Sequence, residues 1–331
     1  MKVRIKVLPV AEKINLDRGY TDFIKIICCL LVAASHYAQN YIINSYGEYN
    51  LFLNLLSTQG GYIGVSFFFF LSGYGLMCSQ LVKQDSFVVF IKRRMSKVYL
   101  PAVYVSIIWL IVLTLIPTLQ QEANLLIDMS KWGLLKSLGS VFLLNFFDSV
   151  LWFVKVILVL YIVLYIYVRL SKSRYDYIRL LYLISATLCV TAFTYYRIAP
   201  FASVSVPVFT CGILVAEFNK WFSDKIIFYS FTIIAIICTL AFLGKDSNIL
   251  LHGVINYLLI ISWLLMSYFY PVQIKGIPAF FVNCSYDVYI THKKVLLAMN
   301  VLHVSYSLLS FMIIAILVAV IEYYSRRFIK L

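Results

Sequence analysis

The amino-acid sequence predicts an all-α, polytopic membrane protein with about ten transmembrane helices around a central cavity and both termini in the cytoplasm. Composition is the first reason, because hydrophobic residues make up 63% of the 331 residues and charged residues only 13%. The mean hydropathy of +0.91 agrees, since such values lie far outside the range of soluble domains. The uneven placement of Lys and Arg is the second reason, and it predicts the orientation.

Crossing the hydrocarbon core of a membrane takes about 20 apolar residues, and ten such windows follow one another along the chain. They cover approximately residues 21–43, 60–82, 98–118, 150–170, 178–197, 199–217, 225–243, 249–270, 277–300 and 304–325. With short connections they use nearly the whole sequence, so we expect a single integral-membrane domain over residues 1–331. The polar stretch before the first window is too long for a signal peptide, so this window is expected to stay in the protein.

The connections between the windows differ in charge. The N-terminus, the C-terminus and the connections on their side hold 20 of the 28 Lys and Arg residues, whereas the opposite connections hold only Lys131, Lys136, Arg197 and Lys245. The positive side is expected to face the cytoplasm, which requires an even number of spans. We interpret the net charge of +14 as this topological signal and expect no nucleic-acid partner. Seven cysteines show no CxxC or Cys/His metal spacing, so neither disulfides nor a metal site are expected.

Two polar side chains interrupt the first window, in IKIICCLLVAASHYAQN at residues 24–40. Lys25 and His36 are eleven residues apart, close to three helical turns, so they share one face about 16 Å apart along the axis. Lys25 can reach the cytoplasmic surface, whereas His36 lies in the outer half of the membrane. Polar groups at that depth are costly and mark candidate functional sites.

A second histidine lies in the ninth window, within NCSYDVYITHKK. His292 and His36 are about equally far from the cytoplasmic ends of their windows, which predicts the same depth of roughly 21 to 23 Å. We therefore expect the two imidazoles to line one cavity from opposite walls, with Lys155, Lys293 and Lys294 at a similar level. For His292, a role in capping its helix or stacking on an aromatic ring is an open alternative.

Five segments resemble, in order, motifs of the acyltransferase-3 family of integral-membrane acyltransferases. These are YTDFIKIICCLLVAASH with its basic residue and histidine, GVSFFFFLSGYGL, FIKRRMSKVYLP, LWFVKVILVLY and CSYDVYITH. Four features depart from the family pattern. Lys25 replaces a common arginine and lacks the planar fork of a guanidinium, and Lys97 also stands where arginine is frequent. Ser66 stands where many members have an acid, and we expect no appended esterase-like domain.

The resemblance implies transfer of an acyl group, usually acetyl from cytoplasmic acetyl-CoA, to a hydroxyl of a cell-surface or lipid-linked glycan. Lys25, Arg93, Arg94 and Lys97 would bind the coenzyme A phosphates. His36 and His292 are the candidate catalytic residues, because attack by a sugar hydroxyl on a thioester needs a base. His36 acting as that base and His36 carrying the acyl group both stay open.

Four further residues are candidates for contacts to the substrate or the oxyanion, and each has a structural alternative. Ser72 and Tyr74 can donate hydrogen bonds to an oxyanion, although the glycines beside them suit close helix packing equally well. Trp152 and Lys155 lie near the outer end of their window, where an aromatic belt is also expected. Apolar residues at helical spacing in 131–147 predict a helix in the outer interface between spans.

Two other classes of function compete with the enzyme. Ten spans with a polar cavity also suit a secondary transporter or a lipid-linked sugar flippase, although the two halves show no self-similarity. A silent scaffold in a glycan-assembly complex is the third reading. Expected partners are the saccharide acceptor, membrane lipids and polysaccharide-assembly proteins, and the resemblance implies a bacterial inner membrane.

Overall fold

The computed structural model describes most of the chain, which forms two compact units. The described residues are 4–7, 16–44, 50–83, 85–126, 133–142, 149–170, 176–218, 247–269, 271–302 and 307–328. Unit 1 consists of Met1–Cys28, Tyr62–Phe87 and Val156–Pro278, and unit 2 of Cys29–Gly61, Val88–Lys155 and Ala279–Leu331. The segments of the two units alternate along the sequence, so each unit is assembled from distant parts of the chain.

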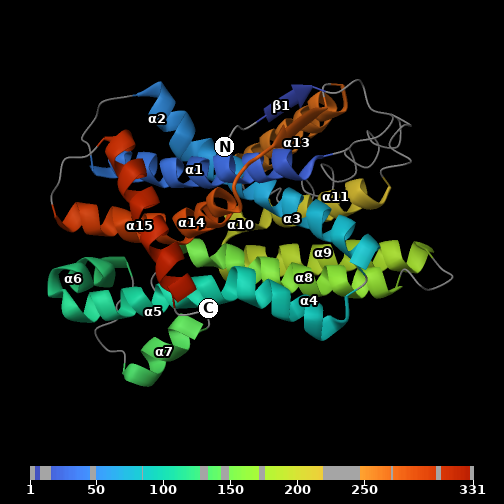
Figure 1. Ribbon diagram of the computed structural model, residues 1–331. Helices are drawn as coiled ribbons and strands as arrows, with labels where there is room; N and C mark the ends of the chain where they lie inside the picture. The colour runs from blue at the N-terminus through green and yellow to red at the C-terminus, as the bar shows by residue number, and fades with distance from the viewer. Residues whose placement is uncertain are drawn as a thin grey trace. The chain divides into compact units, whose positions relative to one another are not determined.

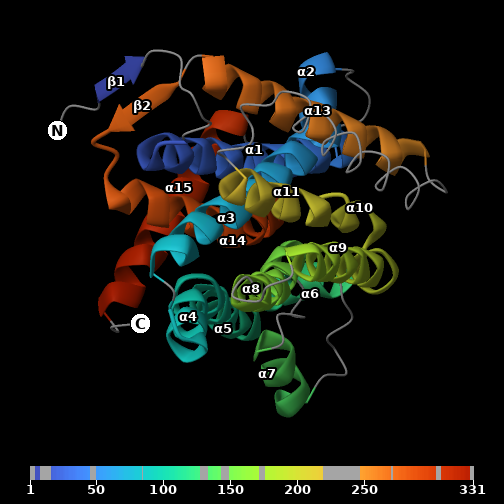
Figure 2. The same ribbon diagram turned by 90° about the vertical axis from the view of Figure 1, so that its right-hand side faces the viewer.

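Unit 1 contains the short sheet and the start of helix α1 (Arg18–Asn44). Strands β1 (Arg4–Val7) and β2 (Val272–Lys275) pair antiparallel and lie side by side in Figure 2. The Asp17 carboxylate accepts a hydrogen bond of 3.0 Å from the backbone N–H of Gly19 at the start of α1, which satisfies one free amide of that helix end. A Cβ at Gly19 would lie 1.8 Å from the Ile274 carbonyl oxygen, so the approach of α1 to β2 requires glycine.

Further helices belong wholly or mostly to unit 1, and two of them pack through glycines. They are α3 (Gly61–Lys83), α8 (Trp152–Leu170), α9 (Asp176–Phe193), α10 (Pro200–Ser203), α11 (Val206–Glu217) and α13 (Ser247–Phe269), with a π-helical turn at Thr194–Ile198. A Cβ at Gly73 of α3 would lie 2.1 Å from the Phe209 carbonyl oxygen, and one at Gly212 of α11 would lie 2.2 Å from the Phe70 carbonyl oxygen. The two glycines therefore let α3 and α11 pack backbone to backbone.

Unit 2 contains the rest of α1 and the C-terminal helices. Its elements are α2 (Leu51–Leu55), α4 (Phe87–Arg94), α5 (Leu100–Leu115), α6 (Pro117–Leu126), α7 (Leu134–Phe142), α14 (Ala279–Val301) and α15 (Leu308–Phe328), with π-helical turns at Leu56–Gly60 and Met95–Tyr99 and a 3₁₀ turn at Ser149–Leu151. Helix α14 packs along α15 and also contacts α5 and α6; α14 and α15 are the red helices of Figure 1. Tyr37 of α1 stacks on Phe311 of α15 at 5.5 Å between ring centroids.

Seven helical stretches among the described residues are long and apolar enough to cross a membrane. They are Arg18–Ile43, Leu51–Gln80, Phe87–Leu115, Trp152–Leu170, Tyr177–Ile198, Pro200–Glu217 and Leu308–Phe328. They correspond to seven of the ten predicted windows and confirm an all-helical polytopic membrane protein. Windows 249–270 and 277–300 form α13 and α14 but are not among these seven, and window 225–243 lies outside the described residues. The count of ten and the cytoplasmic placement of the termini stay predictions.

The connection after the third window contains the predicted amphipathic helix. Within residues 131–147 the structure has α7, Leu134–Phe142, which confirms the helical spacing of the apolar residues. A second helix that the sequence did not predict, α6, precedes it and packs on α14.

Candidate functional site

Helices α1 and α14 of unit 2 bring the two predicted histidines into direct contact. Nδ1 of His36 and Nε2 of His292 are 2.8 Å apart, a hydrogen-bond distance. The rings are nearly parallel, with centroids 4.9 Å apart and planes inclined by 19°. The equal depth predicted by counting residues is confirmed, and the rings touch rather than face each other across a cavity.

The two imidazoles differ in exposure. His292 is fully buried, at 0% relative exposure, whereas His36 is only partly buried. Of the two residues, His36 is therefore the one that keeps some exposed surface.

The hydrogen bonds assign the tautomers of the pair. Nδ1 of His292 lies 3.2 Å from the carbonyl oxygen of Val288, and because a carbonyl can only accept, this nitrogen carries the proton. A neutral His292 then has a lone pair on Nε2, which accepts the Nδ1–H of His36. Neutral is the favoured state of a fully buried imidazole, since a buried charge is costly. In a neutral His36 the unprotonated nitrogen is therefore Nε2.

Aromatic residues and an amide pair surround the two imidazoles. The Tyr289 ring lies 6.0 Å from that of His292, and its hydroxyl donates to the Val150 carbonyl at 3.1 Å. One turn beyond His36, the side-chain amides of Asn40 and Asn300 exchange two hydrogen bonds of 3.0 Å each. These contacts join α1 and α14 along the same seam.

The predicted Trp-Phe element approaches the site through Phe153. The Phe153 ring packs edge-on against Tyr289, with 5.3 Å between centroids, and Tyr289 in turn adjoins His292. Trp152 contacts Phe153 at 6.4 Å and is partly exposed, as is Lys155. Phe153 is thus linked to His292 through the Tyr289 ring. The sequence alone did not indicate this link.

The predicted cations for coenzyme A are distributed over both units. Arg93 and Lys97 are exposed and Arg94 is partly exposed, at the junction of α4 and the π-helical turn in unit 2. The Arg94 guanidinium lies over the Phe90 ring at 5.6 Å. Lys25 belongs to unit 1, where its ammonium pairs with Asp22 at 3.2 Å.

Ser72 and Tyr74 lie on α3 of unit 1. Ser72 is partly exposed and Tyr74 is buried, with its hydroxyl accepting the backbone N–H of Leu16 at 3.4 Å. Of the two adjacent glycines, Gly73 lies at the tight contact with α11, whereas a Cβ at Gly75 would meet nothing within 4 Å. The packing alternative therefore applies to Gly73 but does not account for Gly75.

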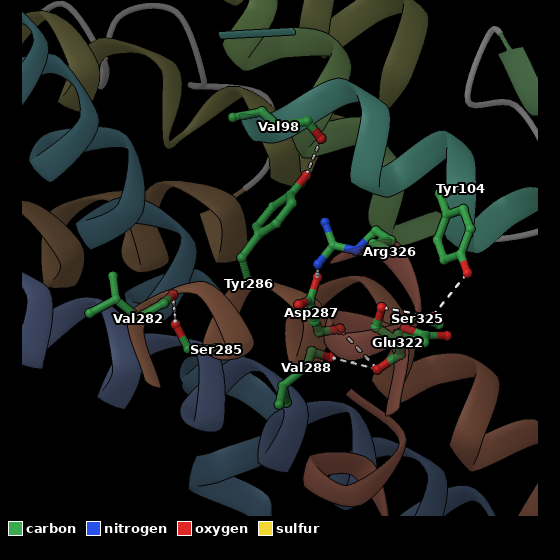
Figure 3. Close-up of polar contacts among 11 residues, drawn as sticks. Val98, Tyr104, Val282, Ser285, Tyr286, Asp287, Val288, Glu322, Ser325 and Arg326 are labelled. Atoms are coloured by element: carbon green, nitrogen blue, oxygen red, sulfur yellow. Dashed lines mark hydrogen bonds and ion pairs between the residues drawn. The ribbon is translucent and has the colours of Figure 1, made fainter. Parts of the chain in front are cut away.

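A group of buried charges on α14 and α15 escaped the sequence analysis. Arg326 Nη2 of α15 donates to Asp287 Oδ1 of α14, and the Asp287 side chain is completely buried (Figure 3). Glu322 and Lys294 are also buried, at 5% and 0% exposure. Asp287 alone could have indicated this group in the sequence, because an acid within a membrane span requires a cation nearby. Arg326 gave no such indication, since a cation near the C-terminus is also explained by the membrane topology.

Long apolar helices with paired ionisable side chains buried between them define a polytopic α-helical membrane protein. The model of the acyltransferase-3 family, described as an acyltransferase domain, matches residues 18–324. The chain belongs to this family and is a membrane acyltransferase. Comparison with curated proteins and with solved structures gave no match. Among the described residues, no group of three or more His, Cys, Asp and Glu side chains is placed to hold a metal ion.

Proposed function

We propose that this acyltransferase moves an acetyl group from cytoplasmic acetyl-CoA to a hydroxyl of a cell-surface or lipid-linked glycan, in the inner membrane of a bacterium. The observation that carries the proposal is the hydrogen-bonded pair of His36 and His292, of which His36 is the partly exposed residue. Hydroxyl attack on a thioester needs a group that removes a proton near neutral pH, and imidazole is the side chain suited to this.

The tautomers assign the roles in this reaction. Nε2 of His36 takes the proton of the acceptor hydroxyl while the hydroxyl oxygen attacks the thioester carbonyl carbon. The tetrahedral intermediate then releases the coenzyme A thiolate, which receives the same proton from His36. Each turnover therefore returns the imidazole to its starting state. His292 accepts the Nδ1–H of His36 throughout, so that in the resting state the free lone pair of His36 is on its Nε2.

The candidate residues that the sequence indicated are assigned to the two substrates by their chemistry. Guanidinium and ammonium groups suit phosphate recognition, and the junction of α4 and the π-helical turn presents three of them within five residues: Arg93, Arg94 and Lys97. We assign these cations, with Lys25, to the coenzyme A phosphates. Ser72 and Tyr74 are assigned to the developing oxyanion, and Trp152 and Lys155 to the acceptor.

The test is loss of the acetyl ester when the base is removed. In cells expressing His36→Ala, we expect the O-acetyl signal of the surface glycan in NMR spectra to disappear at normal protein level. General-base catalysis accounts for about 10²- to 10⁴-fold in rate, so a residual signal below about 1% is expected. His252→Ala is the matched control, since His252 stacks on Tyr62 of unit 1 at 4.3 Å and has no part in the proposed site.

Two results would contradict the proposal in different ways. Full O-acetylation by His36→Ala means that another residue is the base. Purified protein in vesicles that releases no coenzyme A from acetyl-CoA but moves a labelled lipid-linked saccharide across the bilayer means that the activity is transport. An acetyl adduct on His36 in mass spectra of protein quenched during turnover identifies the acyl-imidazole route instead of general-base catalysis.

The phosphate-binding assignment has its own test. Replacing Arg93, Arg94 and Lys97 together by Gln is expected to raise KM for acetyl-CoA by about tenfold or more, because hydrogen bonds to charged groups contribute roughly 1.5 to 3 kcal/mol each. The initial rate of coenzyme A release measures this. The kcat is expected to change by less than about twofold, since these contacts bind the ground state and the transition state alike. An unchanged KM contradicts the assignment.

A further inference from the structure

Helix α14 has an ionic face opposite the face that carries His292. Asp287 and Lys294 are seven residues apart, close to two helical turns, so they point in nearly the same direction. His292 lies about 140° around the helix from Asp287 and about 160° from Lys294. All three side chains have 0% exposure. The fully buried imidazole and the fully buried charges are therefore on opposite sides of one helix.

Helix α15 supplies the partners of the ionic face. Glu322 and Arg326 are four residues apart and share one side of α15. Arg326 pairs with Asp287, and its side chain is 14% exposed. Glu322 is buried at 5% exposure and interacts electrostatically with Lys294. The Tyr104 hydroxyl of α5 donates a hydrogen bond of 2.9 Å to Ser325, next to Arg326, and Figure 3 shows Tyr104 reaching Ser325 and Arg326 reaching Asp287.

The four charges form a formally neutral set, and several of their polar atoms lack a hydrogen-bond partner among the described residues. Two carboxylates face two cations, so each charge depends on the others in a low-dielectric interior. Three polar atoms, Asp287 Oδ2, Glu322 Oε2 and Arg326 Nε, are buried without a hydrogen-bond partner among the described residues. Any motion that separates a pair therefore leaves a buried charge poorly compensated, and such a loss is strongly destabilising.

Rotation of α14 is the motion that this network opposes most. A shift of one residue turns the helix by about 100° and removes Asp287 and Lys294 from α15 together. Apolar packing alone discriminates weakly between rotations, because α14 buries apolar side chains around its whole circumference. Buried polar residues are known to fix helix register in this way.

We propose that Asp287, Lys294, Glu322 and Arg326 are positioning residues that fix the rotation of α14 and so hold His292 against His36. The inference rests on the proposed function of His36, because its consequence is the correct orientation of that base. Tyr286, beside Asp287, adds a hydrogen bond of 2.6 Å to the Val98 carbonyl and supports the same rotation. The network itself touches neither substrate nor reacting atoms.

The test separates positioning from stability by removing both members of one pair. Asp287→Leu/Arg326→Met replaces the pair by apolar side chains, a change that is often neutral for folding. We expect a melting temperature close to that of the unmodified protein, a fall of about tenfold or more in kcat, and a KM for acetyl-CoA within about twofold, because small misplacements of catalytic groups are costly. The rate is coenzyme A release from acetyl-CoA by the purified full chain, in proteoliposomes with the lipid-linked saccharides of its host cells.

The charge-swapped variant Asp287→Arg/Arg326→Asp is the rescue experiment. It restores an ion pair with reversed polarity and is expected to recover most of the lost kcat. A stable double apolar variant with normal kcat overturns the proposal, and so does a stable swapped variant without recovery. If the double variants do not fold, Arg326→Lys decides, because it keeps the positive charge beside Asp287 and removes only the guanidinium geometry. A two- to threefold lower kcat then supports the proposal, and an unchanged kcat overturns it.

The failure of this inference is distinguishable from that of the proposed function. If His36→Ala is inactive and the network variants are fully active, the base is right and the positioning role is wrong. If His36→Ala is fully active, the proposed function of His36 fails, whatever the network variants do.

Discussion

The two faces of α14 use buried polar groups in opposite ways. On one face, His292 meets His36 of α1 through a hydrogen bond of 2.8 Å between ring nitrogens, and His36 is a partly exposed residue. On the other face, Asp287 is paired with Arg326 and sealed from solvent. In our proposals the imidazole face exchanges a proton, whereas the ionic face holds fixed charges that set the rotation of α14. The comparison between them is therefore one of proposed chemistry at an accessible residue and proposed positioning at an enclosed one.

The largest effect on kcat is expected when the fully buried imidazole, that of His292, is replaced. His292→Phe keeps a ring in place but offers no acceptor to Nδ1 of His36, so we expect kcat to fall by about 10²-fold or more. His292→Gln keeps an acceptor oxygen and is expected to retain about ten times the activity of the Phe variant. Coenzyme A release at saturating acetyl-CoA measures both. Equal losses in the two variants mean that His292 itself transfers protons, and normal activity of the Phe variant means that it only packs.

The ionic face is expected to respond to single substitutions through stability. Arg326→Met leaves Asp287 buried without its cation, and breaking a buried pair on one side costs about 3 to 5 kcal/mol. We expect a clearly lower melting temperature in detergent. Adding Asp287→Leu to this variant is expected to restore most of the loss, since no unpaired charge remains. A single variant as stable as the unmodified protein would show that the pair is less enclosed than the structure indicates.

The smallest effect is expected from the amide pair, which lies on the imidazole face without belonging to its chemistry. Asn40→Leu/Asn300→Leu removes both hydrogen bonds between these two amides together. Both stability and kcat are expected to change little, within about 1 kcal/mol and twofold. Thermal unfolding and coenzyme A release measure this. A large loss of kcat with normal stability would show that these amides also contribute to the reaction.

The sequence predicted those parts of the molecule that depend on composition and helical spacing. Seven spans follow from apolar length, and α7 follows from its amphipathic spacing. The equal depth of His36 and His292 follows from counting residues along two helices. Their contact could not be predicted, because it depends on the rotation of α14, which is a tertiary property.

The ionic network shows most clearly why the rest could not be predicted. Arg326 near the C-terminus carries the same sequence signal as any cytoplasmic topological charge, and only packing of α15 on α14 gives it a partner. Lys294 and Lys293 are adjacent in the sequence, yet Lys294 is fully buried while Lys293 is partly exposed. The polar content of α14 that serves these roles also lowers its apolar character, so it is not among the helices identified as spans by composition.

The most direct test of the central claim is the protonation state of His36. ¹⁵N solid-state NMR of the histidine-labelled full chain in lipid bilayers, with His36→Gln used for assignment, reports which ring nitrogen carries the proton. The account predicts a protonated Nδ1 of His36 that is coupled through a hydrogen bond to Nε2 of His292, and an unprotonated Nε2. A protonated Nε2 with a bare Nδ1 would contradict it, because the base would then have no lone pair for the acceptor hydroxyl.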